Sequence, residues 1–171
     1  MTAAINSHVQ CITDLLRHDP NKQVLATFGD GVTALMPSVM AADHGHTDCV
    51  MALLQHRPVQ QVLATFGDGV TALMMAADHG HTDCLMALLQ HRPVQQVLAS
   101  LGNGQTVLMP AARRGHATVI TELQNLQQSP EEQVLAPFGN GTTALMMAAE
   151  QGHTDCVTAL LQHRPEEQVL A

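Results

Sequence analysis

The stretch GDGVTALMMAADHGHTDCLMALLQ (Gly67–Gln90) decides the fold, because it carries the signals of two short helices. A first helix is predicted over Thr71–Gly80, where a capping threonine precedes good helix formers and a glycine ends the run. A second helix is predicted over His81–Pro93, with Asp83 near the positive end of the helix dipole and a proline as the stop. Both are shorter than the ~12–15 residues that an isolated helix needs in water. Each must therefore be stabilised by packing against its neighbours.

The same pattern recurs along the chain. Close variants of QVLATFGDGVTALM occur at Gln23–Met36, Gln61–Met74, Gln96–Met109 and Gln133–Met146. The glycine of the Gly-His pair lies at positions 45, 80, 115 and 152, so successive units are 35, 35 and 37 residues apart. A period of this size indicates a solenoid of stacked helical units.

This unit resembles the ankyrin repeat. The resemblance is carried by Gly-x-Thr, Ala-Ala, Gly-His and Leu-Leu, which recur in register over nearly the whole chain. Two features depart from the family pattern. Its Pro-Leu-His reads Ala-Leu-Met here, which removes the usual Thr–His hydrogen bond, and the linker is longer than in the ~33-residue ankyrin unit. The resemblance implies an all-α, ankyrin-like helical repeat solenoid of helix-turn-helix units, each of about 35 residues, joined by short helical or loop linkers.

The expected organisation is a single ankyrin-repeat array over residues 1–171. It consists of a partial repeat over 1–30 and of repeats over about 31–68, 69–103, 104–140 and 141–171. The linker SPEEQVLA (Ser129–Ala136) has the serine, proline and glutamates of a helix start and predicts a short helical turn. The FGDG and FGNG tips predict tight turns. Pro37 is expected to restart a first helix, whereas Pro110 is expected to distort one.

Composition limits the class of protein. Of the 171 residues, 46% are hydrophobic but only 2% are aromatic, so Leu, Ala, Val and Met must fill the core between short, closely packed helices. With 15 acidic and 7 basic residues the net charge is −8, which leaves no large basic surface for nucleic acid. No apolar run is long enough to span a membrane, and the N-terminus lacks the basic start and apolar centre of a signal peptide. We expect a cytoplasmic protein.

The motif His-x-His-x-Asp occurs twice, at His44–Asp48 and His79–Asp83, with a spacing that zinc hydrolases use. The first histidine is replaced in other units by Arg114 and Gln151. The second histidine persists in every unit, as His8, His46, His81, His116 and His153. A Gly-His corner between two helices needs only this second histidine, whose imidazole can bond to neighbouring backbone. We therefore predict no metal and no cofactor; a metallohydrolase that uses these clusters is the alternative.

The cysteines occupy one column on the apolar side of the second helix, at Cys11, Cys49, Cys84 and Cys156. Adjacent helices pack ~8–10 Å apart, whereas the Cα atoms of a disulfide lie within ~4.4–6.8 Å. A buried apolar slot also lacks the groups that stabilise a reactive thiolate. The cysteines are therefore expected to be reduced core residues, which favours a reducing, intracellular compartment.

The methionines divide between core and surface. Leu73, Leu108 and Leu145 are expected in the core, and Met74, Met109 and Met146 at half-buried positions. Met75 and Met147 take the place that faces the concave groove in ankyrin repeats, where flexible thioethers suit an adaptable binding surface. Core filling is the alternative for both.

The residues before each Gly-His corner change from unit to unit. They read Asp43-His44, Asp78-His79, Arg113-Arg114 and Glu150-Gln151, so that one basic pair lies between pairs that contain an acidic residue. A partner segment with an acidic group flanked by basic or polar groups would complement this row, and a merely solvated row of charges is the alternative. The resemblance implies a non-catalytic module that binds a protein or peptide through the concave groove and loop tips. A repeat fragment of a larger protein, with the function located elsewhere, is a further alternative.

Overall fold

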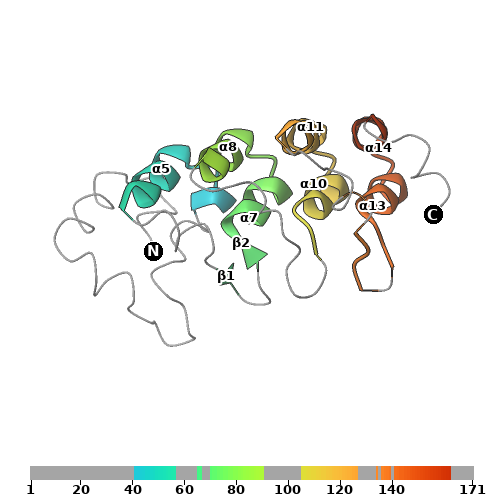
Figure 1. Cartoon of the computed structure of the whole chain (residues 1–171), viewed down its shortest axis with the longest axis horizontal. Coiled ribbons are helices and arrows are strands. Elements are labelled where there is room, and N and C mark those ends of the chain that lie inside the picture. Colours follow the sequence, from blue (N-terminus) through green and yellow to red (C-terminus); the bar gives the residue numbers. More distant parts are fainter. Residues whose placement is uncertain are drawn as a thin grey trace. The chain divides into compact units, whose positions relative to one another are not determined.

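The architecture is a set of helix pairs (Figure 1). The computed structural model describes residues 41–56, 65–66, 70–90, 105–126, 134, 136–139 and 141–162. Its elements are α5 (Thr47–His56), β1 (Thr65–Phe66), β2 (Val70–Thr71), α7 (Ala72–Asp78), α8 (Thr82–Gln90), α10 (Leu108–Arg114), α11 (Ala117–Asn125), α13 (Ala144–Glu150) and α14 (Thr154–Leu161). The predicted partial repeat over 1–30, the restart at Pro37 and Cys11 lie outside the described residues.

The chain divides into two compact units. The first unit comprises Met1–Ala76 and Asp83–Pro93, and the second comprises Ala77–Thr82 and Val94–Ala171. The corner between α7 and α8 therefore belongs to the second unit, together with α10, α11, α13 and α14.

In the first unit a hairpin leads into a capped helix. The antiparallel strands β1 and β2 place Thr65 opposite Thr71 and Phe66 opposite Val70. The backbone N–H of Met74 donates to Oγ1 of Thr71 at 3.2 Å, so Thr71 caps α7 as predicted. The side chains that α8 buries include the predicted apolar stripe of Cys84, Leu85, Leu88 and Leu89.

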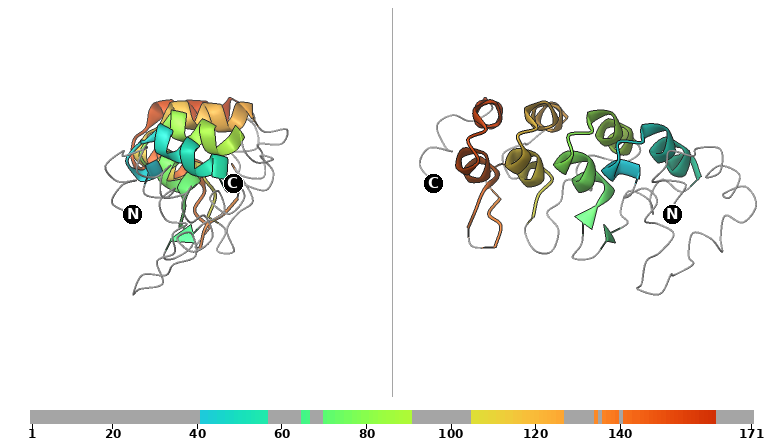
Figure 2. Two further views of the ribbon diagram at one scale, coloured as in Figure 1. Left: turned by 90° about the vertical axis from the view of Figure 1, so that its left-hand side faces the viewer. Right: turned by 180° about the vertical axis from the view of Figure 1, so that it is seen from behind.

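The second unit contains two helix pairs side by side (Figures 1 and 2). In it α10 packs against α13 and α11 against α14, while α10 also contacts α11 and α13 contacts α14. Each helix is short, and even α11 has only 9 residues. Burial of Leu108, Ile120, Leu123 and Leu160 between the helices supplies the stability that such short helices lack alone. These helix-turn-helix pairs confirm the predicted all-α, ankyrin-like repeat class.

The FGNG tip is a tight turn, as predicted. The N–H of Phe138 donates to the carbonyl of Thr142 at 2.9 Å, and the N–H of Thr142 donates back at 3.2 Å. Of the helical turn predicted over Ser129–Ala136, only Val134, which is helical and buried, and Ala136 are described. The middle of the FGDG tip lies outside the described residues.

Pro110 changes the start of α10. In α13 the N–H of Met146 donates to Oγ1 of Thr143 at 3.3 Å and so caps the helix. A helix carbonyl normally accepts from the residue four positions on, but Pro110 has no N–H, and the carbonyl of Thr106 accepts instead from Met109 at 3.3 Å. Because the N–H of Met109 is used in this way, Oγ1 of Thr106 is buried without a hydrogen-bond partner. The predicted distortion of this turn is confirmed.

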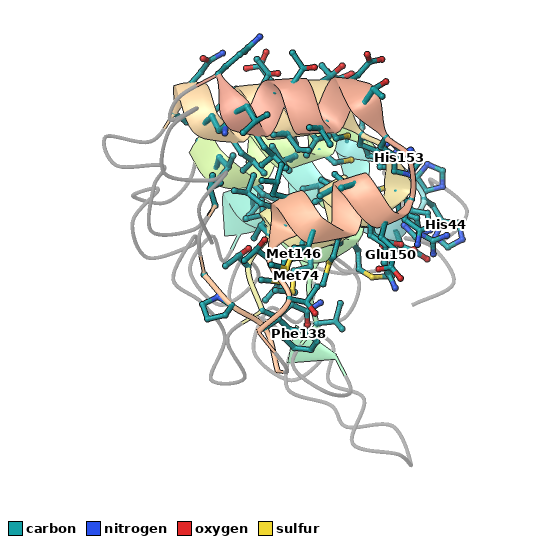
Figure 3. All side chains as sticks on the ribbon, turned by 90° about the vertical axis from the view of Figure 1, so that its right-hand side faces the viewer. His44, Met74, Phe138, Met146, Glu150 and His153 are labelled. Carbon is teal, nitrogen blue, oxygen red and sulfur yellow. The ribbon has the colours of Figure 1, made fainter. Side chains whose placement is uncertain are left out.

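The methionines that directly follow a leucine in the first helix of each unit differ from their predicted burial. These side chains were expected to be half-buried, but Met74 and Met109 are 4% and 1% exposed, whereas Met146 is 44% exposed. Leu145, expected in the core, is only half-buried. Met146 lies on the side of the second unit that faces the viewer in Figure 3, where no further described helix pair follows α13 and α14. Within the second unit, Met109 is followed by the helix pair α13 and α14, whereas no described helix pair follows Met146, and a single unit of sequence does not reveal this difference.

Gln124 is a polar residue at a position of the second helix where the other units have an apolar residue. The equivalent residues in the other units are Leu54, Leu89 and Leu161. The side chain of Gln124 is only 2% exposed, and neither its amide nitrogen nor its amide oxygen has a hydrogen-bond partner. Leaving such a buried group unpaired costs about 1–3 kcal/mol.

We expect Gln124→Leu to raise the free energy of unfolding by about 1–3 kcal/mol, because leucine fills the slot without burying an unpaired amide. Urea denaturation followed by circular dichroism measures the change. Gln90→Leu is the matched control, since Gln90 is exposed and its replacement should change stability by less than about 0.5 kcal/mol. If the Gln124→Leu variant is no more stable than the parent, the buried amide of Gln124 does not destabilise the fold and the prediction is wrong.

Candidate functional site: the helix corners and their charged row

Each of two Gly-His corners in the second unit hydrogen-bonds to the backbone of the corner before it. Nε2 of His116, just before α11, donates to the carbonyl of Asp78 at 2.9 Å. Nε2 of His153, just before α14, donates in the same way to the carbonyl of Arg113 at 3.1 Å. Because a carbonyl can only accept, Nε2 carries the proton in both imidazoles. The predicted bonding of the corner imidazole to neighbouring backbone is confirmed at these two histidines.

The same imidazoles lie directly over glycines. A Cβ built at Gly80 would be 2.6 Å from Nδ1 of His116, and one at Gly115 would be 2.9 Å from Cε1 of His153. Gly80 also has a φ of +72°, a left-handed conformation that is costly for residues with a side chain. Glycine is required here both for the backbone conformation and for the space that the ring occupies.

The first histidine of each His-x-His pair stacks on the second. The ring centroids of His79 and His81 are 5.9 Å apart with an interplanar angle of 13°, and those of His44 and His46 are 5.9 Å apart at 22°. Among the residues that the structure describes, no group of three or more His, Cys, Asp or Glu side chains could hold a metal ion. The geometry thus offers no support for the metallohydrolase alternative within that part of the chain.

Asp78 forms the principal charged contact of the second unit. Its Oδ1 accepts from Nη2 of Arg113 at 2.8 Å, and its Oδ2 accepts from Nε of Arg114 at 3.2 Å. The carboxylate side chain is 13% exposed, whereas both arginine side chains are 56% exposed. Two cations therefore share one anion, and the cluster keeps one net positive charge on a chain whose net charge is −8.

Two opposing effects set the pKa of Asp78. Partial burial acts to raise the pKa, but the hydrogen bonds and charges of Arg113 and Arg114 together outweigh it and hold the pKa below its usual value of 3.8. A carboxyl group whose pKa is lower in the folded than in the unfolded chain stabilises the fold above the unfolded pKa. That stabilisation disappears as the pH falls through the folded pKa.

We expect Asp78→Asn to lower the free energy of unfolding at neutral pH by up to about 1 kcal/mol, the usual range for exposed ion pairs. The difference from the parent chain should shrink as the pH falls below 3.8, because the parent carboxyl then becomes protonated as well. Denaturant titrations at several pH values measure it, and Glu150→Gln, at an exposed carboxylate one unit further on, is the control. A difference that stays constant into strong acid would contradict the ion-pair account.

The described cysteines are buried free thiols, at Cys49, Cys84 and Cys156. Burial raises the pKa of Cys84, against a contact of 3.2 Å with Oγ1 of Thr47 that lowers it, and burial with nearby Asp155 raises the pKa of Cys156. The thiols of Cys84 and Cys156 are therefore protonated at neutral pH and are weak nucleophiles. Their column belongs to the core, as the sequence predicts.

The residues predicted to bind a partner fall in both units. Those in the first unit are Asp43, His44 and Met75. Those in the second unit are Asp78, His79, Arg113, Arg114, Met147, Glu150 and Gln151. The corner hydrogen bonds join successive corners of the second unit, and we refer to all members of the second set except the apolar Met147 as the charged row. The pairing of Asp78 with the two arginines was not predicted, although opposite charges one period apart were the available signal.

Comparison with known proteins gives one clear result. A family model described as ankyrin repeats (3 copies) matches residues 1–98 and 92–169. No curated protein matches the chain. None of the described helices is long and apolar enough to cross a membrane.

Proposed function

The chain belongs to the ankyrin repeat family, and from this premise we propose that it is a non-catalytic module that binds a protein or peptide through the charged row of its second unit. Ankyrin repeats are generally protein–protein interaction modules. Fold alone does not establish a function, so the proposal depends on the surface of this particular chain.

The proposal is supported by the positions at which the units differ from one another. Positions that keep their residue type are buried framework, as Leu73 and Leu108 are. The positions just before each corner change from His79 to Arg114 to Gln151 and are exposed in every case. A fixed framework that presents different exposed side chains in sequence is what a specific protein-binding surface requires.

The charges of the row indicate the chemistry of the partner. Arg113 and Arg114 keep one net positive charge beyond what Asp78 neutralises, and guanidinium groups bind carboxylates with directed hydrogen bonds. Glu150 follows in the next helix pair and is exposed. The row therefore complements a segment that carries a carboxylate next to a basic or polar group.

Selection from a displayed library of random peptides tests this function. On the parent chain we expect enrichment of peptides that contain Asp or Glu beside a basic residue, with binding that weakens as salt is added. For a synthesised peptide from this pool, Arg113→Glu with Arg114→Glu should raise the Kd at least about tenfold, which corresponds to about 1.4 kcal/mol.

The control places acidic groups on another exposed surface, through Thr118→Glu with Asn125→Glu on α11. This variant should bind the peptide as the parent does, because its added charges lie outside the charged row. If both double variants bind with the parent's affinity, or if selection enriches no carboxylate-bearing peptide, the proposed function is wrong.

A further inference from the structure

Asp78 is the less exposed partner of the two cations in the charged row. Its Oδ1 accepts from Nη2 of Arg113 at 2.8 Å and also from Nε of Arg114 at 3.3 Å. The carboxylate side chain is 13% exposed, against 56% for each arginine side chain. A ligand that approaches from solvent therefore meets the guanidinium groups first and has the carboxylate close behind them.

Both guanidinium groups keep N–H groups that Asp78 does not use. Arg113 donates from Nη2 and Arg114 from Nε, and neither side chain donates to any other residue within the described part of the chain. Both Nη atoms of Arg114 and Nη1 of Arg113 are therefore available to an anion. Because the two groups donate to the same carboxylate oxygen, they are held close enough together for a single anion to contact both.

The charge of this cluster limits which anion it matches. Arg113 and Arg114 are positive, and Asp78 is negative at neutral pH because its pKa lies below the usual value of 3.8. A partner carboxylate brings a single negative charge and cancels the net positive charge that remains. A phosphate group carries up to about two negative charges. Its second charge would lie near the carboxylate of Asp78 and be repelled by it.

We propose that Asp78 is a specificity-determining residue of the charged row, because it neutralises one arginine charge and so makes the row select a partner's carboxylate side chain over a phosphorylated residue. This inference rests on the proposed function and deepens it, since the same two arginines bind the partner. Asp78 acts as an opposing charge built against the wrong ligand. Without that charge, the exposed guanidinium groups of Arg113 and Arg114 should favour the doubly charged group.

Two small anions that share a phenyl ring test this preference. At about pH 8 benzoate carries one negative charge and phenyl phosphate about two, while histidines are neutral. Nuclear magnetic resonance titrations that follow the isotope-labelled guanidinium carbons of Arg113 and Arg114 give a Kd for each anion. The parent chain should bind phenyl phosphate at most about twofold more tightly than benzoate. In Asp78→Asn this preference should rise at least about fivefold, because asparagine keeps the shape and an acceptor oxygen but not the charge.

Asp155→Asn is the matched control. It removes the same charge from an exposed residue of α14 outside the charged row, and the parent's preference should not change. If Asp78 only positions the arginines, Asp78→Asn should weaken binding of both anions by the same factor. An unchanged ratio of the two Kd values would therefore overturn the proposal, as would arginine signals that respond to neither anion.

A parent chain that prefers phenyl phosphate as strongly as Asp78→Asn does would overturn the proposal as well. The outcome is separable from that of peptide selection. A ratio that shifts while selection enriches no carboxylate-bearing peptide counts against the proposed function alone. Successful selection with an unchanged ratio counts against the role of Asp78 alone.

Discussion

Gly80→Ala should lower the free energy of unfolding by about 2–5 kcal/mol, a large effect for one added methyl group. Two costs combine. The φ of +72° is unfavourable for alanine by about 1–2 kcal/mol. The new Cβ would also lie 2.6 Å from the ring of His116, which must move and give up its hydrogen bond to the carbonyl of Asp78. A lost bond of this kind costs about 1–3 kcal/mol when its partner is left unpaired.

Gly152→Ala measures the backbone cost without the steric cost. Its φ of +73° matches that of Gly80, but no described atom lies within 4 Å of the added Cβ. Only the backbone cost of about 1–2 kcal/mol should then appear. His116→Ala should cost less in the Gly80→Ala background than in the parent, because the ring is already displaced. Equal losses for Gly80→Ala and Gly152→Ala in urea denaturation would show that the imidazole contact contributes nothing.

Leu160→Ala should destabilise the chain by about 2–5 kcal/mol. Leu160 is completely buried in α14, which packs against both α11 and α13. Truncation removes buried apolar surface and leaves a cavity between short helices that have little stability of their own. Loss of this contact should therefore unfold α14 first, seen as faster hydrogen exchange in its amides than in those of α10.

Leu161→Ala is the matched control, since the same chemical change is made one residue away. Leu161 is only half-buried, so the loss should be about 1 kcal/mol. A parent chain that loses as much from Leu161→Ala as from Leu160→Ala would contradict the burial that distinguishes them.

Local features of this fold are predictable because their causes are local. Thr71 caps α7 through an atom three residues away, and the FGNG tip closes within a few residues. Pro110 disturbs α10 because it removes one N–H, an effect that needs no knowledge of the tertiary structure. Each of these follows from backbone hydrogen bonding within one turn.

Features that depend on the neighbouring unit are harder to predict. Met109 and Met146 occupy equivalent positions of the second unit, yet only Met146 is exposed, because a described helix pair follows α10 and α11 but none follows α13 and α14. The contact between Asp78 and Arg113 joins residues 35 positions apart and converts a candidate binding charge into a partly neutralised one. The sequence shows which residues are charged, but it does not show which of their side chains come close enough to form an ion pair.

The central claim is that His116 and His153 are structural and each hydrogen-bond to the backbone of the preceding corner. Nuclear magnetic resonance of the chain with isotope-labelled imidazole nitrogens, recorded before and after addition of stoichiometric zinc, tests it most directly. The hydrogen bonds to the carbonyls of Asp78 and Arg113 require that His116 and His153 carry the proton on Nε2. The signals of both should report that tautomer and should not change when zinc is added. Loss of the Nε2 proton at these residues, together with tight binding of one zinc ion, would contradict the claim.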